Sequence, residues 1–177
     1  MKRCDVTGAG FLSAGDQGRL WWQIQAGFTE GDGVGGGVMV FEERADDELK
    51  PILWTFEGAQ YETPSLERHD DGQWLLFVPG ISRGTGSGDT SVMMLWREGK
   101  WRPVDMDWEG RVGAQLGGME VWHKPRWAFP RLMASSPLWR PGDGGCCGTS
   151  VTAEMEFDIF DDQLTLINAK ITRVPAG

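Results

Sequence analysis

Alternation of apolar and polar side chains near the C-terminal end constrains the fold of this chain more than any other feature. In residues 151–159, Val, Ala, Met, Phe and Ile alternate with Thr, Glu, Glu and Asp. Successive side chains of a β-strand point to opposite faces, so this pattern predicts a strand with one buried and one solvated face. Asp161 and Asp162 interrupt the pattern, and residues 164–174 resume it with β-branched side chains. The two segments together predict a β-hairpin.

Similar segments recur along the chain between glycines, prolines and acidic residues. Residues 20–28 alternate in the same way, with Gln23 and Gln25 on the polar face. Further apolar segments that fit strands are residues 38–43, 52–56, 74–78, 92–96 and 101–106. No segment repeats apolar residues at helical spacing between capping residues. We therefore expect an all-β fold, either a single antiparallel β-sandwich or an irregular barrel, with long Gly/Pro-rich loops and little helix.

Length and composition favour one domain over residues 1–177. A chain of 177 residues buries enough surface for a hydrophobic core without help from a metal, and no change in composition marks a linker. The 26 glycines indicate many turns, and the 10 tryptophans supply large apolar side chains. No sequence feature calls for a metal or another cofactor.

The charge of the chain argues against a nucleic-acid partner, and its hydropathy argues against a transmembrane segment. The net charge is −9, so the averaged field repels the phosphates of nucleic acids. No apolar run approaches the ~18 residues of a transmembrane helix. Lys2 and Arg3 are not followed by the apolar stretch of a signal peptide. We expect neither a nucleic-acid partner nor a transmembrane segment.

Two glycine motifs match functional patterns but lack the flanking structure that those functions need. Residues 31–36, Gly-Asp-Gly-Val-Gly-Gly, fit G-x-G-x-x-G, but a strand pattern follows instead of the helix that binds a pyrophosphate, so we expect a hairpin loop. Residues 80–84 fit the G-x-S-x-G elbow of esterases and place Ser82 after an apolar strand, with His69 or His123 as candidate base. Because the residues after Ser82 are a poor helix start, an esterase is the alternative rather than the leading hypothesis.

Three acidic residues alternate after the apolar segment 101–106. On an extended strand, Asp105, Asp107 and Glu109 would present a row of carboxylates, which suits a hard cation or acid/base chemistry on a glycan. The simpler interpretation is a solvated strand face with Met106 and Trp108 buried behind it. We favour the simpler interpretation and keep glycan chemistry through Asp105 and Asp107 as an alternative.

Residues 122–140 form the most informative segment for function, because they contain basic and aromatic residues and no acid in an acidic protein. Rings stack on the apolar faces of sugars, and guanidinium groups bind carboxylates or phosphates. The structural alternative is that arginines stack on tryptophans and fix a long connection to the core. The candidate binding residues are Trp122, His123, Lys124, Arg126, Trp127, Arg131, Trp139 and Arg140.

The three cysteines leave several pairings open. Cys4 could bridge to Cys146 or to Cys147, or the two adjacent cysteines could form a strained bridge with each other. A metal cluster is disfavoured, because adjacent cysteines lack the spacing with which two thiolates share a tetrahedral ion.

The segment Ser136-Pro-Leu-Trp-Arg-Pro-Gly-Asp143-Gly-Gly-Cys146-Cys147, followed by the C-terminal hairpin, resembles the C-terminal signature of a group of uncharacterised, generally exported bacterial proteins. The loop of residues 84–88 and Trp122 agree with this resemblance, which covers about the last half of the chain. The group reads Cys-Cys-Pro-x-Gly-Gly, whereas Gly-Thr-Ser follows Cys147 here, so the resemblance does not define the shape of this loop. The resemblance implies an extracytoplasmic β domain and no particular activity.

An exported setting makes a bridge at Cys4 chemically reasonable, because oxidising compartments preserve disulfides. The alternative is a cytoplasmic chain with three buried thiols. We expect a periplasmic or secreted, non-catalytic binding or structural module that holds a glycan, a peptide or a protein partner. The alternatives are a hydrolase, through Ser82 or through Asp105 and Asp107, and an accessory subunit of a larger assembly whose exposed tryptophans contact its partners.

Overall fold

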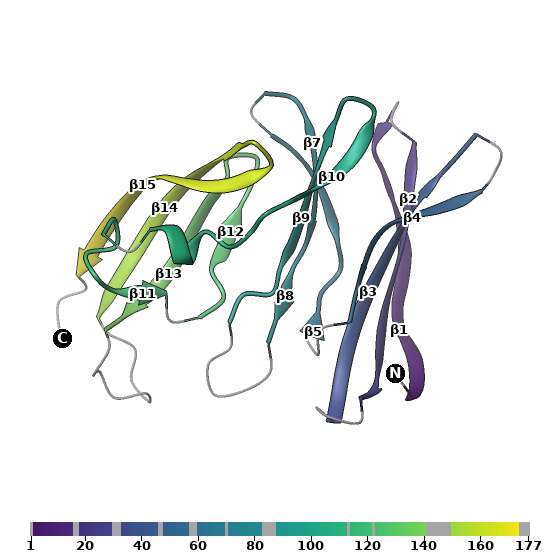
Figure 1. Cartoon of the computed structure of the whole chain (residues 1–177), viewed down its shortest axis with the longest axis horizontal. Helices are drawn as coiled ribbons and strands as arrows, with labels where there is room; N and C mark the ends of the chain where they lie inside the picture. The colour runs from purple at the N-terminus through teal and green to yellow at the C-terminus, as the bar shows by residue number, and fades with distance from the viewer. Residues whose placement is uncertain are drawn as a thin grey trace.

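The computed structural model of the chain contains three antiparallel sheets that are stacked as successive layers (Figure 1). This arrangement confirms the all-β fold. The structure describes residues 2–15, 18–29, 33–45, 48–56, 60–69, 71–82, 88–112, 114–121, 123–140 and 150–173. Within these ranges the helical structure is limited to short 3-10 turns, such as η2 (Glu109–Arg111). The expectation of little helix is therefore confirmed for the described residues.

The first sheet is a meander of four strands that pair in chain order. These are β1 (Lys2–Ser13), β2 (Arg19–Thr29), β3 (Gly33–Glu43) and β4 (Leu49–Thr55). Residues 33–36 of the glycine motif belong to β3, so the expected hairpin loop is shorter than predicted. At Gly37 the ring of Phe56 lies where a Cβ would be, 2.1 Å from its Cδ1, so this strand position accepts only glycine without displacing the ring.

The middle sheet pairs in the order β10-β9-β7-β6, and a short pair, β5-β8, lies at its end. Its strands are β6 (Ser65–Arg68), β7 (Trp74–Val78), β9 (Val92–Arg97) and β10 (Lys100–Val104), and the short pair is β5 (Gln60–Tyr61) and β8 (Gly80–Ile81). The segments predicted as strands at 74–78 and 92–96 are the two central strands of this sheet, and the segment predicted at 101–106 supplies its edge strand β10, which ends at Val104.

The third sheet contains the C-terminal hairpin from which the sequence analysis began. It pairs in the order β11-β13-β14-β15, and β12 also pairs with β13; its strands are β11 (Glu120–Val121), β12 (Arg126–Ala128), β13 (Met133–Trp139), β14 (Val151–Phe160) and β15 (Gln163–Arg173). Asp161 and Asp162 form the turn of the hairpin, and both have positive φ, 49° and 59°. Asp tolerates this backbone conformation better than most residues, so the two acids define the turn.

Two hydrophobic cores separate the three sheets, and the middle sheet contributes to both. Leu75 and Phe77 of β7 belong to the core shared with the third sheet, whereas Leu76 and Val78 belong to the core shared with the first sheet. Adjacent residues of a strand point to opposite faces, so β7 is buried on both sides. The molecule therefore has three layers, one more than a single sandwich (Figure 1).

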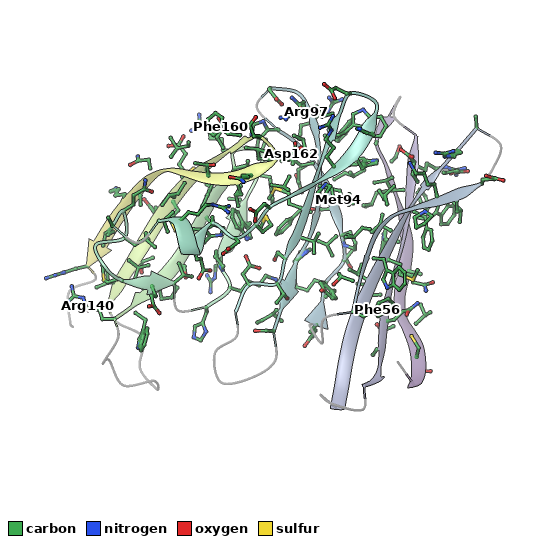
Figure 2. The ribbon with its side chains drawn as sticks, viewed as in Figure 1. Phe56, Met94, Arg97, Arg140, Phe160 and Asp162 are labelled. Carbon is green, nitrogen blue, oxygen red and sulfur yellow. The ribbon has the colours of Figure 1, made fainter. Side chains whose placement is uncertain are left out.

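The turn of the C-terminal hairpin joins the third sheet to the middle sheet. The backbone N–H of Asp105 donates to the carbonyl of Asp162 over 2.8 Å, and the N–H of Leu164 donates to the carbonyl of Asp105 over 3.0 Å. Arg97 pairs with the Asp162 carboxylate at 3.3 Å, and Arg102 also approaches this carboxylate, at 3.6 Å (Figure 2). These contacts fix the segment after β10, which leads into the candidate site.

Candidate functional site

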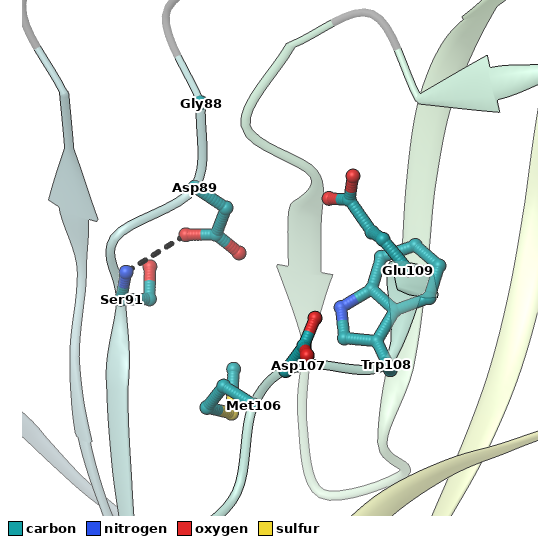
Figure 3. Close-up of a pocket in the computed structure, with 7 residues that line it drawn as sticks. All are labelled: Gly88, Asp89, Ser91, Met106, Asp107, Trp108 and Glu109. Carbon is teal, nitrogen blue, oxygen red and sulfur yellow. Dashed lines mark hydrogen bonds between the residues drawn. The ribbon is translucent and has the colours of Figure 1, made fainter. Parts of the chain in front are cut away.

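A concavity between the middle and third sheets consists of two adjoining pockets. We call these two pockets together the interlayer groove. The first pocket, of about 400 Å³, is lined by Gly88, Asp89, Ser91, Met106, Asp107, Trp108 and Glu109 (Figure 3). The second, of about 220 Å³, shares Gly88, Asp89 and Glu109 and adds Glu120, Val121, His123 and Trp139. Because three residues line both pockets, one elongated ligand can occupy both.

Asp89 is fixed in the groove by contacts to two sheets. One carboxylate oxygen accepts a hydrogen bond from the backbone N–H of Ser91 over 2.9 Å. The other accepts a hydrogen bond from the indole Nε1 of Trp127 in the third sheet over 3.1 Å. The side chain therefore bridges the two sheets while it lines both pockets.

The connection after β10 carries Asp107 and Glu109 into the groove and turns Asp105 away from it. Asp105 accepts the backbone N–H of Asp107 over 2.9 Å and pairs with Arg111 over 2.8 Å. The hydrogen bond from Asp107, followed by the Arg111 guanidinium, lowers the pKa of the Asp105 carboxyl. Asp105 thus remains ionised and holds the turn in place.

The alternative of a row of three carboxylates is wrong, because the chain is not an extended strand over Asp105, Asp107 and Glu109. Strand β10 ends at Val104, and Glu109 lies in the 3-10 turn. The turn brings Asp107 and Glu109 to one side of the pocket, facing Asp89 across it (Figure 3). Trp108 is buried, as the simpler interpretation of this segment expected.

Negative charge accumulates around Glu109. Burial raises the pKa of its carboxyl, and the nearby carboxylates of Asp89, Asp107 and Glu120 raise it further. The folded protein therefore holds like charges together in a half-desolvated site at some cost in stability. Such an arrangement is more frequent at functional sites than elsewhere on a protein surface.

We predict that Glu109→Gln stabilises the protein at pH 7. The pKa of Glu109 is raised above 4.5, so its ionised form disfavours the folded state above that raised pKa. The cost diminishes as pH falls through the raised pKa, and it is lost below the ordinary pKa of 4.5, where the carboxyl is protonated in both the folded and the unfolded chain. Solvent-screened charge interactions of this kind are worth about 0.2–1 kcal/mol, so the variant should melt about 1–3 °C higher at pH 7, and the difference should be nearly gone near pH 4.

Thermal melts of both proteins from pH 4 to pH 8 test this expectation. The control is Glu156→Gln, an exposed glutamate of β14 that lies outside the groove. A gain in melting temperature that is the same at pH 4.5 and pH 7, or equal in the two variants, would contradict the assigned cause.

The described residues of the basic and aromatic segment 122–140 contribute to two different pockets. His123 and Trp139 line the groove, whereas Lys124, Arg126 and Trp127 line a separate pocket of about 350 Å³ with Glu62. Lys124 pairs with Glu62 at 2.9 Å. Arg131 and Arg140 are exposed and line neither pocket, and Trp122 lies outside the described residues.

Trp127 is half-buried, and its ring packs against aromatic residues of two sheets. Its ring lies 6.1 Å from that of Phe77 in the middle sheet and 5.2 Å from that of Phe157 in the third sheet. The indole also donates to Asp89. Trp127 therefore fixes its connection to the core, which agrees with the structural alternative for this residue.

The candidate esterase residues have other contacts. The hydroxyl of Ser82 accepts the backbone N–H of Gly88 over 2.8 Å, which closes the loop between them. The ring of His69 lies between Asp71, at 3.1 Å, and Asp158, at 3.6 Å. His69 thereby links the middle and third sheets, because Asp158 belongs to β14.

The structure shows no disulfide among the described residues. Cys4 is a free, exposed thiol that donates to the side-chain oxygen of Gln25 over 2.8 Å. The expectation of a bridge at Cys4 is thus not supported, and its exposure also contradicts the alternative of three buried thiols. Cys146 and Cys147 lie outside the described residues.

Comparisons of the chain with protein-family models, curated proteins and solved structures find no match. Nowhere in the described part of the chain is there a helix with the length and hydropathy to cross a membrane. Within the same residues, no three His, Cys, Asp or Glu side chains are placed to hold a metal ion. The groove must therefore be interpreted from its own geometry.

Proposed function

We propose that this protein is a non-catalytic binding module that holds a cationic group of a peptide, protein or amino-sugar ligand in the interlayer groove. The observation that carries the proposal is the convergence of four carboxylates on adjoining pockets of about 400 and 220 Å³. They come from separate segments of the chain: Asp89 precedes β9, Asp107 and Glu109 follow β10, and Glu120 lies in β11. An ammonium or guanidinium group bound there would neutralise the charge that raises the pKa of Glu109.

One aromatic side chain in the groove favours the same class of ligand. The half-buried Trp139 lines the second pocket, whereas Trp108 is buried behind the first. The face of an indole attracts a cation through its quadrupole, and the attraction is larger where the cation is partly desolvated. The net charge of −9 also attracts a basic ligand over longer distances.

The proposal extends to an extracytoplasmic setting and to a partner in the cell envelope. Its support is the resemblance of residues 136–147 to the signature of generally exported proteins. An accessory subunit of a larger assembly is compatible with the same groove, if the cationic group belongs to a neighbouring subunit.

Calorimetric titration with matched ligands tests the proposal. Trilysine and a chitosan oligosaccharide carry free ammonium groups, and their fully N-acetylated counterparts have the same backbones without these charges. We expect binding of at least one charged ligand, and a loss of on the order of tenfold in affinity on N-acetylation and in Glu109→Gln, because a charged hydrogen bond contributes about 1.5–3 kcal/mol.

Glu156→Gln is the control variant, because it removes the same charge from an exposed site outside the groove. It should bind as the native chain does. Equal affinity for charged and N-acetylated ligands, or an unchanged affinity in Glu109→Gln, would remove the cation-binding function from the groove.

A specific observation favours glycan hydrolysis as the second candidate. A carboxyl with a raised pKa close to a second carboxyl group is the arrangement of a glycosidase acid and its partner, here Glu109 with Asp107 or Asp89. This pairing replaces the predicted pair of Asp105 and Asp107, because Asp105 is bound to Arg111. Release of reducing sugar from a chitosan oligosaccharide, abolished in Glu109→Gln, would favour this candidate over simple binding.

A further inference from the structure

The outer face of the first sheet carries exposed aromatic side chains that the core does not use. Cross-strand pairing places Phe11, Trp21, Phe41 and Pro51 in one row across the four strands. A neighbouring row contains Ala9, Gln23, Met39 and Trp54 in the same order. Residues directly opposite each other in a sheet share a face, so both rows lie on one surface. We call the six residues Phe11, Trp21, Gln23, Met39, Trp54 and Phe56 the aromatic platform.

This surface is the side of the first sheet that faces away from the other two sheets. The inner face is occupied by Leu20, Val38 and Val40, which belong to the core shared with the middle sheet. The first sheet forms one end of the molecule, and its outer side chains project away from the other layers (Figure 2). The platform is therefore remote from the interlayer groove.

Large apolar side chains on the platform are open to solvent. Trp54 is 69% exposed and Phe11 is 57% exposed. Trp54 and Phe56 are in edge contact at 5.8 Å, and Phe11 contacts Trp21 at 5.6 Å. Single exposed apolar residues are ordinary, but contiguous rings on adjacent strands mark an interaction surface.

The ring of Trp21 is held in position from the border of the platform. The Nε1 of Trp21 donates to Glu43 over 3.3 Å, and Glu43 pairs with Arg19 at 2.7 Å. The Arg19 guanidinium also lies 5.9 Å from the Trp21 ring centroid. An aromatic side chain fixed in this way loses little conformational entropy when it binds a ligand.

Charge and polarity indicate what the platform binds. Neither row contains a charged residue, although the whole chain carries −9. The amide of Gln23 lies in the second row, between Ala9 and Met39, and its Nε2 donates to the Met39 sulfur at the long distance of 4.0 Å. A surface of stacking rings and an amide complements an uncharged, hydroxyl-rich chain, whereas the net charge opposes an anionic membrane or an acidic polymer.

We propose that the aromatic platform binds a neutral polysaccharide, whose pyranose rings stack on Trp21 and Trp54 while its hydroxyls bond to Gln23. Four strands at the usual spacing make the platform about 14 Å wide, enough for several consecutive sugar units. This second surface does not depend on the function of the interlayer groove.

Native affinity electrophoresis in gels containing hydroxyethyl cellulose, arabinoxylan, laminarin or dextran tests the proposal. We expect retardation by at least one of these neutral polymers and none by alginate, which is anionic. Trp54→Ala should weaken the retardation on the order of tenfold, as expected for the loss of one stacked ring. Because Trp54 is largely exposed, this variant should keep its melting temperature.

Phe160→Ala is the matched control, since Phe160 is a 54% exposed aromatic residue on the third sheet. It should migrate as the native chain does in every gel. The proposal is overturned if none of the four polymers retards the protein or if Trp54→Ala binds unchanged. It is also overturned if the platform proves to be a contact between two copies, seen as a dimer in sedimentation that Trp54→Ala dissociates, or if it binds phosphatidylglycerol vesicles instead.

Discussion

Leu75→Ala and Leu76→Ala should each destabilise the protein by about 2–5 kcal/mol, although the two residues are neighbours in one strand. Both side chains are fully buried, Leu75 against the third sheet and Leu76 against the first sheet. Each truncation removes buried methyl groups and leaves a cavity in a different core. In a chain of this length, the corresponding fall in melting temperature is roughly 5–15 °C.

Chemical denaturation of the two variants measures the effect and tests the three-layer arrangement. In a two-layer sandwich one of two adjacent strand residues faces solvent, and its truncation is tolerated. Ile167→Ala provides the comparison, because Ile167 is exposed on β15 and its truncation should change the free energy of unfolding by no more than about 0.5 kcal/mol. If either Leu75→Ala or Leu76→Ala were as mild as Ile167→Ala, β7 would not be buried on both faces.

The local strand structure could be predicted from the sequence, because alternation depends only on neighbouring residues. The hairpin of β14 and β15 and its turn at Asp161 and Asp162 follow directly from the pattern. The sequence also contains a signal for the middle sheet, in the uninterrupted apolar segments 74–78 and 92–96. A strand without polar alternation is buried on both faces, and that signal separates a central layer from the half-solvated sheets on either side.

The groove could not be predicted in the same way, because its residues are brought together only by the stacking of two sheets. Asp89, Glu109 and Glu120 lie in three different segments of the chain, and Asp89 and Glu120 have no acidic neighbours in the sequence that would single them out. The alternation of Asp105, Asp107 and Glu109 pointed to the right segment but to the wrong geometry, since the chain leaves the strand after Val104. No local pattern indicates that Asp105 binds Arg111 while Asp107 faces the pocket.

Trp127 shows why the basic and aromatic segment was difficult to interpret. A tryptophan between cations fits a ligand-binding face and a connection packed on the core equally well. The structure places its ring against Phe77 and Phe157 and its N–H on Asp89, so its contribution to stability links two sheets. Arg126, its neighbour in β12, is exposed, and the two residues should therefore behave differently when truncated.

We expect Trp127→Ala to cost about 3 kcal/mol of stability, near the lower end for a buried tryptophan because the ring is only partly buried. Trp127→Phe retains most of the ring contact and loses the hydrogen bond to Asp89, so it should cost about 1 kcal/mol. Arg126→Ala should be nearly neutral. Urea denaturation of the three variants gives these free energies, and equal stability of Trp127→Ala and Arg126→Ala would show that the ring is not part of the core.

The same variants connect the core to the groove. Without the indole N–H, the Asp89 carboxylate keeps its bond to Ser91 but loses its link to the third sheet. Trp127→Phe should therefore weaken binding of the charged probes by less than Glu109→Gln does, because it misplaces one carboxylate without removing a charge. A Trp127→Phe variant that binds at least as tightly as the native chain would mean that the position of Asp89 in the groove does not depend on the third sheet.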